Sequence, residues 1–136
     1  MMIAQVKQKD IDKYGQFKIN RMLGDSENLA KKLSSLAPLS NWFLRNRFVQ
    51  KIIERFVGID KRRPFPSFQR NTFEKWFRTH NSRGKHKVAY FMDIFANYND
   101  PEIGKAATFV LEHNNSRVIL PKQRSSGMPY VSYGDL

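Results

Sequence analysis

A strand–helix–strand pattern in the C-terminal third of the chain constrains the fold more than any other feature. KVAYFMDIF (87–95) is a nearly continuous apolar run of strand length, and SRVILP (116–121) is a second such run. Uninterrupted apolar strands are typical of parallel sheets that are buried on both faces. Between the two runs, Asp100 is placed to cap a helix and Pro101 suits its first turn. The pattern predicts a β-α-β unit.

The helix of this unit has one predicted apolar face. Its apolar side chains recur at the i, i+3, i+4, i+7 and i+8 spacing that places them on one side of a helix. We expect this face to lie on the sheet, and it consists of Ile103, Ala106, Ala107, Val110 and Leu111. The loop KQRSSGMP then follows the carboxyl end of the second strand, where open α/β sheets place their sites.

The preceding part of the chain predicts helices joined by turns. Residues 1–24 are polar and mixed, and residues 25–37 carry a leucine stripe that predicts a helix. Residues 40–58 form the strongest predicted helix, which Ser40 caps and Gly58 ends. The linker GIDKRRPFPSFQR follows, and its two prolines exclude a regular helix.

A further short helix is expected over 72–79, where Asn71 and Glu74 fit a capping-box-like start. We place a boundary in the polar, basic loop that follows, between a helical basic connector at 1–83 and the first part of an α/β domain at 84–136. The predicted fold class is α/β, with a partial, Rossmann-like β-α-β unit after the connector. We call the unit partial because two strands are few for a free-standing parallel sheet.

Charge and composition narrow the classes of function. The chain has 136 residues, with 24 Lys and Arg against 12 Asp and Glu, and a formal net charge of +12. This excess favours an anionic partner such as nucleic acid, an acidic membrane face or an acidic protein surface. Cysteine is absent, which excludes disulfides and thiolate metal sites in this chain. With no signal-peptide or membrane-spanning run, we expect a cytoplasmic protein, peripheral on a membrane if attached to one.

Motifs of self-contained enzymes are absent. The chain has neither a dinucleotide-binding G-x-G-x-x-G nor a Walker phosphate loop, and no glycine precedes SSG in the manner of a nucleophile elbow. No histidine has a partner at metal-ligand spacing, and ordinary surface or capping roles are expected for His80, His86 and His113. One enzymatic hypothesis stays open, a hydrolase that uses Ser125 or Ser126 with support from Asp135 or His113.

A basic, aromatic-rich segment between residues 42 and 78 is the strongest candidate for contact with a partner. Three interpretations stay open for it. It is a helical layer with a solvated basic face, a membrane-interface helix with Trp and Phe at the lipid boundary, or a nucleic-acid-binding surface without a recognised motif. The residues assigned to partner or membrane contact are Trp42, Arg45, Arg47, Lys51, Arg55, Lys61, Arg62 and Arg63.

Three segments together resemble one protein family. They are GIDKRRPFPSFQRNTFEKWFR, KVAYFMDIFANYNDPEIGKAA and RSSGMPYVSYG. In this order they resemble the iron–sulfur oxidoreductases of the cysteine-cysteine-glycine (CCG) domain class. This class includes the C subunit of anaerobic glycerol-3-phosphate dehydrogenase and the iron–sulfur proteins of FAD-linked lactate or glycolate oxidases. The resemblance is clearest over 36–136, and its most specific motif residues are Asn97, Tyr98, Asn99, Pro101, Glu102 and Gly104.

The resemblance implies a role in electron transfer. Members of the family pass electrons from a flavin dehydrogenase that holds FAD through iron–sulfur clusters, toward a membrane quinone pool or another acceptor. The implied partners are a flavin dehydrogenase, other iron–sulfur subunits and the inner membrane surface, with nucleic acid less favoured. The resemblance also implies that the chain starts after the family's ferredoxin-like part and stops inside its first CCG module.

The chain departs from the family at the cluster ligands. Ser125, Ser126 and Gly127 stand where the family has Cys-Cys-Gly, and Ile94 lies near the position of a further cysteine in some relatives. Cluster iron needs soft thiolate ligands, so serine is a poor substitute. We therefore expect no cofactor and a docking or structural role, as a segment or degenerate subunit of an iron–sulfur oxidoreductase. The alternative is a basic module that binds nucleic acid or a membrane surface.

Overall fold

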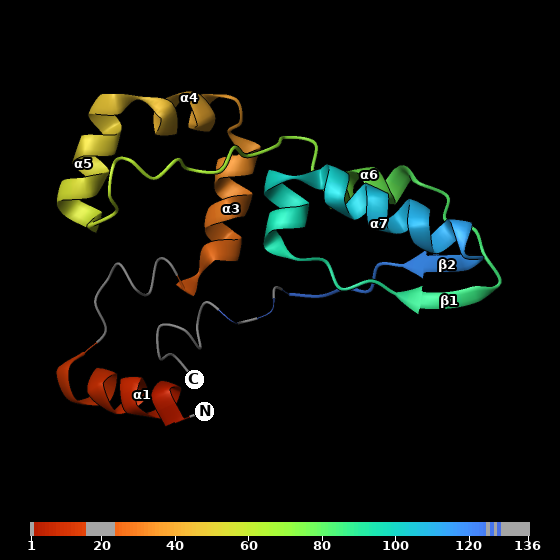
Figure 1. Ribbon diagram of the computed structural model, residues 1–136, viewed down its shortest axis with the longest axis horizontal. Helices are drawn as coiled ribbons and strands as arrows, with labels where there is room; N and C mark the ends of the chain where they lie inside the picture. Colours follow the sequence, from red (N-terminus) through yellow and green to blue (C-terminus); the bar gives the residue numbers. More distant parts are fainter. Residues whose placement is uncertain (1, 16–23, 125, 127, 129–136) are drawn as a thin grey trace. The chain divides into compact units, whose positions relative to one another are not determined.

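The chain forms two structural units, seen in a computed structural model that describes residues 2–15, 24–124, 126 and 128 (Figure 1). One unit consists of residues 1–29 and 124–136, and the other of residues 30–123. The described structure is mostly helical, with a small parallel sheet of two strands. The expected boundary between residues 83 and 84 remains a prediction.

The first unit contains a helix that the sequence patterns do not predict. Helix α1 (Met2–Tyr14) ends at Gly15, whose φ of +79° is left-handed and whose N–H donates to the carbonyl of Ile11 at 2.7 Å. Residues 2–14 lack a strong apolar stripe, but their Lys, Gln and Met residues favour helix intrinsically. The helix was therefore missed because the prediction relied on apolar periodicity.

Three short helices follow: α3 (Ser26–Ser35), α4 (Leu39–Arg45) and α5 (Arg47–Val57). Ser40 does not cap the predicted helix, because its hydroxyl donates to the carbonyl of Leu33 at 2.6 Å and joins α4 to α3. In this arrangement a polar side chain near the start of α4 serves packing between helices.

The prediction of one continuous helix over 40–58 is wrong, because Asn46 interrupts it. Asn46 has extended backbone angles (φ −71°, ψ 123°), and its side-chain oxygen accepts the N–H of Phe48 at 2.8 Å. Asparagine competes with the helical backbone in this way and starts a new helix as its N-cap. The predicted end is confirmed, since Gly58 has a φ of +74° at the end of α5.

The linker around Phe68 is extended and held from several sides. The N–H of Phe68 donates to the side-chain oxygen of Asn41 at 2.7 Å, and the Asn41 amide donates back to the Phe68 carbonyl at 2.8 Å. The Ser34 hydroxyl donates to the carbonyl of the next residue, Gln69. Phe68 is buried in a small core whose other members are Ala30 and Tyr98, with Leu33, Leu44 and Ile94 packed around them. The linker is therefore part of the packed structure.

Helix α6 (Phe73–Thr79) begins one residue later than predicted. Thr72, not Asn71, is the N-cap, and its hydroxyl accepts the N–H of Lys75 at 3.3 Å. Asn71 is exposed, whereas Phe73 is fully buried. The cap therefore places the ring of Phe73 inside the second unit.

Helix α7 (Pro101–His113) lies against this ring at a glycine. A Cβ atom added to Gly104 would lie 2.6 to 2.9 Å from three atoms of the Phe73 ring, closer than packed atoms approach. Buried Thr108 directs its hydroxyl to the Gly104 carbonyl at 2.9 Å, so its polar group is satisfied within the helix. Only a residue without a side chain lets α7 and the Phe73 ring come this close.

The predicted inner face of α7 is wrong for three of its five residues. Ile103, Ala106 and Val110 are exposed, whereas Ala107 and Leu111 are half-buried. The fully buried face is formed by Pro101, Gly104 and Thr108. Both sets follow helical spacing, so periodicity alone does not choose between them. The helix turns its small residues inward because the large Phe73 ring occupies the space against it.

The sheet pairs β1 (His86–Ala89) with β2 (Ser116–Ile119) in parallel, with Val88 opposite Val118. The two strands and the helix between them confirm the β-α-β order. The predicted first strand, 87–95, is too long. After Ala89 the chain leaves the sheet and enters the π-helix η1 (Phe95–Asn99), where the Asp93 carboxylate accepts the N–H of Phe95 at 3.2 Å. That local hydrogen bond favours a helical start over an extended strand.

The prediction that both strands are buried on two faces is also wrong. Val118 is the one buried strand residue, while Lys87, Ala89, Arg117 and Ile119 are exposed. Helix α7 packs on β2 and covers one face (Figure 1). An apolar run thus signals a strand here without signalling that both of its faces are covered.

A histidine–carboxylate pair joins the ends of α6 and α7. His80 Nε2 lies 2.9 Å from Glu112 Oε1, and the His80 ring stacks on Trp76 at 4.4 Å between centroids. Burial alone would raise the pKa of Glu112. Hydrogen bonds from Ser82 and His80 outweigh burial, so the pKa of this carboxyl lies below its ordinary value. His80 is therefore a packing and capping residue, as expected from the sequence.

We expect Gly104→Ala to lower the free energy of unfolding by about 1–2 kcal/mol. Overpacking against Phe73 costs about 1–3 kcal/mol, which exceeds the gain of up to about 1 kcal/mol from replacing glycine in a helix. Urea denaturation measures the change, with Ile103→Ala as an exposed control on the same helix. Adding Phe73→Leu should recover part of the loss in a double-mutant cycle. A Gly104→Ala variant as stable as the parent would contradict the close packing.

We expect Glu112→Gln to destabilise the protein by about 1 kcal/mol near neutral pH and by less in acid. A carboxyl with a depressed folded pKa adds stability above its unfolded pKa of about 4.3, and this stability is lost as pH falls through the folded pKa. Urea denaturation at a series of pH values measures the difference between parent and variant. Glu102→Gln, on the exposed side of α7, is the control. A difference that grows toward low pH would refute this account.

Candidate docking surface

Helix α5 presents two parallel stripes to solvent. Phe48, Ile52 and Phe56 are exposed by 71%, 43% and 78% and recur every four residues, so they align along one side of the helix. The basic stripe next to them, one residue earlier at each turn, consists of Arg47, Lys51 and Arg55. Only Val49 of this helix is buried. The helix is therefore amphipathic, yet much of its apolar surface is uncovered.

Helix α4 also exposes large aromatic residues. Trp42 and Phe43 are exposed by 66% and 53%, and Arg45 is exposed beside them. An uncovered group of large aromatic residues is uncommon on a monomeric protein and marks an interaction site. We call the exposed aromatic, apolar and basic residues of these two helices the α4–α5 face. It consists of Trp42, Phe43, Arg45, Arg47, Phe48, Lys51, Ile52, Arg55 and Phe56.

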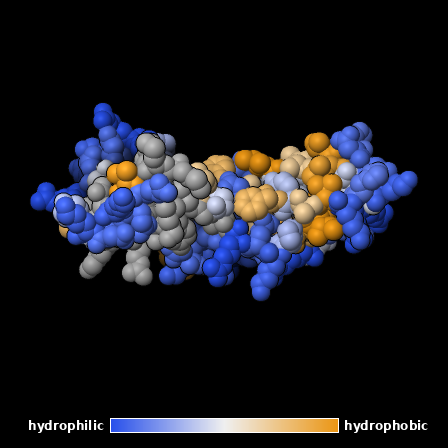
Figure 2. Space-filling model, turned by 90° about the horizontal axis from the view of Figure 1, so that it is seen from below, coloured by the Kyte–Doolittle hydropathy of each residue, from blue (hydrophilic) through white to orange (hydrophobic). Residues whose placement is uncertain are grey.

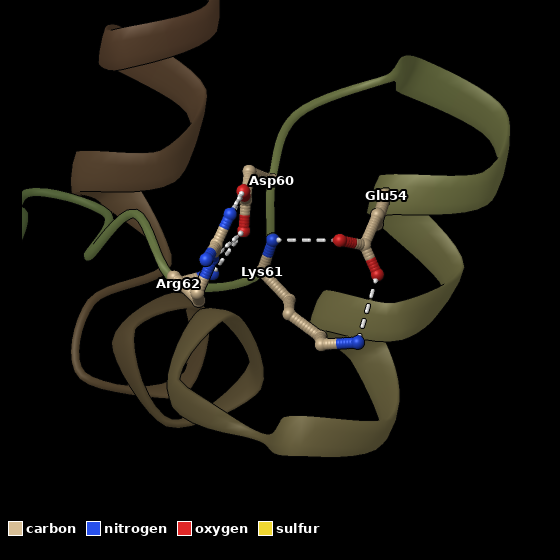
Figure 3. Close-up of polar contacts among 4 residues, drawn as sticks. All are labelled: Glu54, Asp60, Lys61 and Arg62. Carbon is tan, nitrogen blue, oxygen red and sulfur yellow. Dashed lines mark hydrogen bonds and ion pairs between the residues drawn. The ribbon is translucent and has the colours of Figure 1, made fainter.

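Two of the predicted contact residues, Lys61 and Arg62, form ion pairs within the turn after α5 and with the helix itself (Figure 3). The Arg62 guanidinium forms a two-pronged ion pair with Asp60, with Nη2 to Oδ2 at 2.6 Å. The side chain of Arg62 lowers the pKa of the Asp60 carboxyl. Lys61 Nζ lies 3.3 Å from Glu54 Oε2, and the Lys61 N–H donates to the other Glu54 oxygen at 3.4 Å. Lys61 and Arg62 thus shape the turn.

The remaining predicted cations have no such partner. Among the residues that the structure describes, no carboxylate forms an ion pair with Arg45, Arg47, Lys51, Arg55 or Arg63, and all five are exposed. Exposed pairs contribute little to folding, and unpaired cations contribute less still. Their charge remains available to an anionic partner.

The loop that carries the predicted cluster-ligand positions lies only partly within the described residues. Ser126 is exposed, while Ser125 and Gly127 lie outside the described residues. Just before this loop, Gln123 accepts the N–H of Met92 at 3.0 Å and donates to the carbonyl of Tyr90 at 3.2 Å. The chain that enters the loop is therefore tied to the segment after β1.

Ile94, near the position where some relatives of the resembled family have a further cysteine, is partly buried and packs against the core cluster. Of the hydrolase candidates, His113 is exposed at the end of α7, while Asp135 lies outside the described residues. The hydrolase therefore stays a hypothesis.

The motif residues 97–99 fasten η1 to the linker and to α6. The Asn97 side-chain oxygen accepts the N–H of Glu74 at 3.0 Å, which gives α6 a second cap beside Thr72. The Tyr98 carbonyl accepts the N–H of Gln69 at 2.7 Å. The Asn99 amide donates to the carbonyl of Ser67 at 3.0 Å. Three consecutive residues thus hold residues 67–74 in place.

The other motif residues begin α7. Pro101 occupies its first turn, as predicted, and is buried. Asp100 stands at the N-cap without a side-chain hydrogen bond to the helix. Glu102 is exposed and pairs with Lys105 at 2.7 Å, and Gly104 admits the Phe73 ring. In these contacts the motif residues act on packing and capping.

The described residues contain neither a group of metal-ligating side chains nor a membrane-spanning helix. Within residues 2–15, 24–124, 126 and 128, no group of three or more His, Asp or Glu residues could hold a metal ion. No helix in this part of the chain is long and apolar enough to cross a membrane. The surface with the most evident capacity for interaction is therefore the α4–α5 face.

Comparisons with known proteins identify curated relatives of this chain. The C subunit of anaerobic glycerol-3-phosphate dehydrogenase from Escherichia coli strain K12 is 29% identical over 119 residues, which is 85% of this chain. The chain is a distant homologue of this protein. The corresponding protein of Escherichia coli O157:H7 matches equally well. No protein-family model matches the chain, and no solved structure does.

The homology covers a limited part of the relative. The chain spans 30% of the length of the Escherichia coli proteins that it matches. The 29% identity over 85% of this chain confirms the resemblance noted from the sequence, at the level of distant homology. The activity and partners of the whole relative come to this chain only as proposals.

The predicted contact residues omit the two most exposed aromatic side chains of the α4–α5 face, Phe48 and Phe56. Both lie in the helix predicted over 40–58, and their spacing with Ile52 forms a stripe of its own. The adjacent Arg47, Lys51 and Arg55 were a signal that this apolar stripe is exposed, because a stripe beside three charged residues is poorly placed for burial. The sequence alone does not show which of two apolar stripes faces the core.

We expect Asn97→Ala to lower the free energy of unfolding by about 1–3 kcal/mol, because it leaves the N–H of Glu74 without its partner in a buried place. Asn71→Ala is the matched control. Asn71 was the predicted cap but is exposed, so its removal should change stability by less than about 0.5 kcal/mol. Denaturant unfolding of both variants measures the contrast. Equal losses in the two variants would argue against Asn97 as the second cap.

Proposed function

We propose that this chain is a docking and positioning segment of an iron–sulfur oxidoreductase complex, partnered with a flavin dehydrogenase. The observation that carries the proposal is the homology to the C subunit of anaerobic glycerol-3-phosphate dehydrogenase over 85% of the chain. A protein named as a subunit works within an assembly, and contact with other subunits is the property that this chain retains. The role is structural, as a segment or degenerate subunit.

In this proposed role, the chain does not transfer electrons through an iron–sulfur cluster of its own. The chain has no cysteine, so no thiolate is available to bind cluster iron. Ser125 and Ser126, at the positions of the family's ligands, keep a turn-forming sequence with Gly127 but offer poor ligands to iron. In this proposal β1, α7 and β2 are the first part of a CCG-like, Rossmann-like domain whose cluster chemistry is carried by other subunits.

The α4–α5 face is the proposed contact surface. Covering one exposed Phe side chain contributes about 1.5–3 kcal/mol to binding, before the costs of association are subtracted. Aromatic and arginine side chains are also the residues that contribute most at protein interfaces. The five unpaired cations favour a partner surface rich in carboxylates.

An anionic membrane surface is the second candidate. The observation that favours it is the alignment of Phe48, Ile52 and Phe56 beside Arg47, Lys51 and Arg55. A helix with this pattern can lie in the lipid boundary, with each basic residue contributing about 1 kcal/mol near an acidic leaflet. Nucleic acid has the support of net charge and exposed aromatic residues, without a recognised motif.

The test compares two double variants with the parent. Phe48→Glu/Phe56→Glu alters the α4–α5 face, and Ile103→Glu/Val110→Glu alters another exposed apolar part of the chain, on α7, as a control. Affinity is measured for a flavin dehydrogenase from the same organism, for vesicles with phosphatidylserine, and for single-stranded DNA. We expect the parent to bind the dehydrogenase, and the first variant to lose at least about tenfold in affinity while the control does not.

Other outcomes decide among the remaining functions. Binding to acidic vesicles but not to the dehydrogenase would replace the docking proposal by the membrane candidate. Salt-sensitive binding to DNA alone would favour a nucleic-acid module. Equal losses in both double variants would show that the α4–α5 face is not the contact surface.

A further inference from the structure

The two outer edges of the parallel sheet differ. The outer edge of β2 is occupied, because Ser82 Oγ accepts the outward N–H of Val118 at 2.8 Å. Gly84 follows and lies so close to this strand that an added Cβ atom would be 2.3 Å from the carbonyl carbon of Ser116 and 2.4 Å from the nitrogen of Arg117. The segment before β1 therefore covers this edge and leaves little space for another strand.

The outer edge of β1 is open. The N–H groups of His86 and Tyr90 donate to Asn115 and Ile119, so the even-numbered residues of this segment direct their backbone toward β2. Lys87 and Ala89 consequently direct their N–H and C=O groups away from β2. No strand among the described residues pairs with that side, since the sheet has the order β1–β2. An edge of this kind accepts an added strand.

The side chains along this edge indicate what such a strand would carry. Lys87 is opposite Arg117 in the register, so two exposed cations are neighbours on the face away from α7. Among the described residues, no carboxylate forms an ion pair with either. Like charges on adjacent strands destabilise a sheet, and an acidic side chain beside them would relieve the repulsion.

The next pair on the same face is apolar. Ala89 is opposite Ile119, which is exposed by 39%, and Phe91 beyond the end of β1 is exposed by 56%. Figure 2, seen from below the view of Figure 1, shows a band of hydrophobic surface toward the end of the molecule where the sheet lies, with hydrophilic surface at the outermost end. A complementary strand therefore has an acidic residue beside Lys87 and an apolar residue beside Ala89, two positions away along the strand.

We propose that the outer edge of β1 binds an extended, acidic and apolar segment of a partner protein, which adds to the sheet as a third strand. A second copy of this chain is a poorer occupant. No acidic residue occurs from Arg83 to Met92, so β1 pairing with itself would bring basic side chains together. The β1 edge is distinct from the α4–α5 face, so this inference stands or falls independently of the docking proposal.

The test uses the full chain and an extended, end-blocked peptide of alternating Glu and Val. A matched peptide has Lys in place of Glu. We expect the acidic peptide to bind and to slow hydrogen exchange at the Lys87 and Ala89 amides, measured by NMR, while the Val118 amide stays unchanged. Lys87→Glu should weaken binding of the acidic peptide by about fivefold, as expected for reversing one cross-strand charge pair, and should favour the basic peptide. Lys31→Glu makes the same change of charge at an exposed position of α3, outside the α4–α5 face, and should have no effect.

A second variant separates backbone pairing from charge. Ala89→Pro removes an outward N–H that β2 does not use, so the variant should stay folded and lose peptide binding. Equal binding of the two peptides, protection of Val118 instead of Ala89, or equal effects of Lys87→Glu and Lys31→Glu would each overturn the proposal. Concentration-dependent self-association through the β1 edge would overturn the choice of a partner protein as occupant.

Discussion

The contact between the Phe73 ring and Gly104 is the constraint on which the second unit depends. It lets α6 and α7 approach closely, and the aromatic residues around it, including Trp76, then pack on the same side of α7. The contact fixes the rotation of α7, and therefore which of its residues are buried. It also fixes the position of the α6 N-terminus, which Asn97 caps from η1. Packing and hydrogen bonding here support the same arrangement, which is typical of sequences that specify one structure.

The sequence predicted some elements well for physical reasons. Pro101 and Gly58 have backbone preferences that hold almost regardless of their surroundings, and both stand where predicted. The alternation of apolar runs with a helical pattern predicted the β-α-β order. Each of these signals is local, so one sequence is enough to read it.

Other elements depended on what the chain packs against. The inner face of α7 was predicted from its apolar residues, but glycine and threonine face inward because a ring from α6 needs the space. The break at Asn46 and the early end of β1 arise from single side-chain hydrogen bonds that compete with a regular backbone. At the α4–α5 face, the sequence identified the cations but did not separate those bound by Asp60 and Glu54 from those left unpaired.

Gln123 has a consequence for how such a fold changes over time. Its amide is bound to both an N–H and a carbonyl of the segment after β1, so the path of the chain toward Ser125 and Ser126 is set before those residues are reached. The anchoring group is an uncharged amide that needs no metal. Substitutions at positions 125 and 126 therefore leave this anchor intact, and such changes can accumulate in the loop without loss of the scaffold that leads into it.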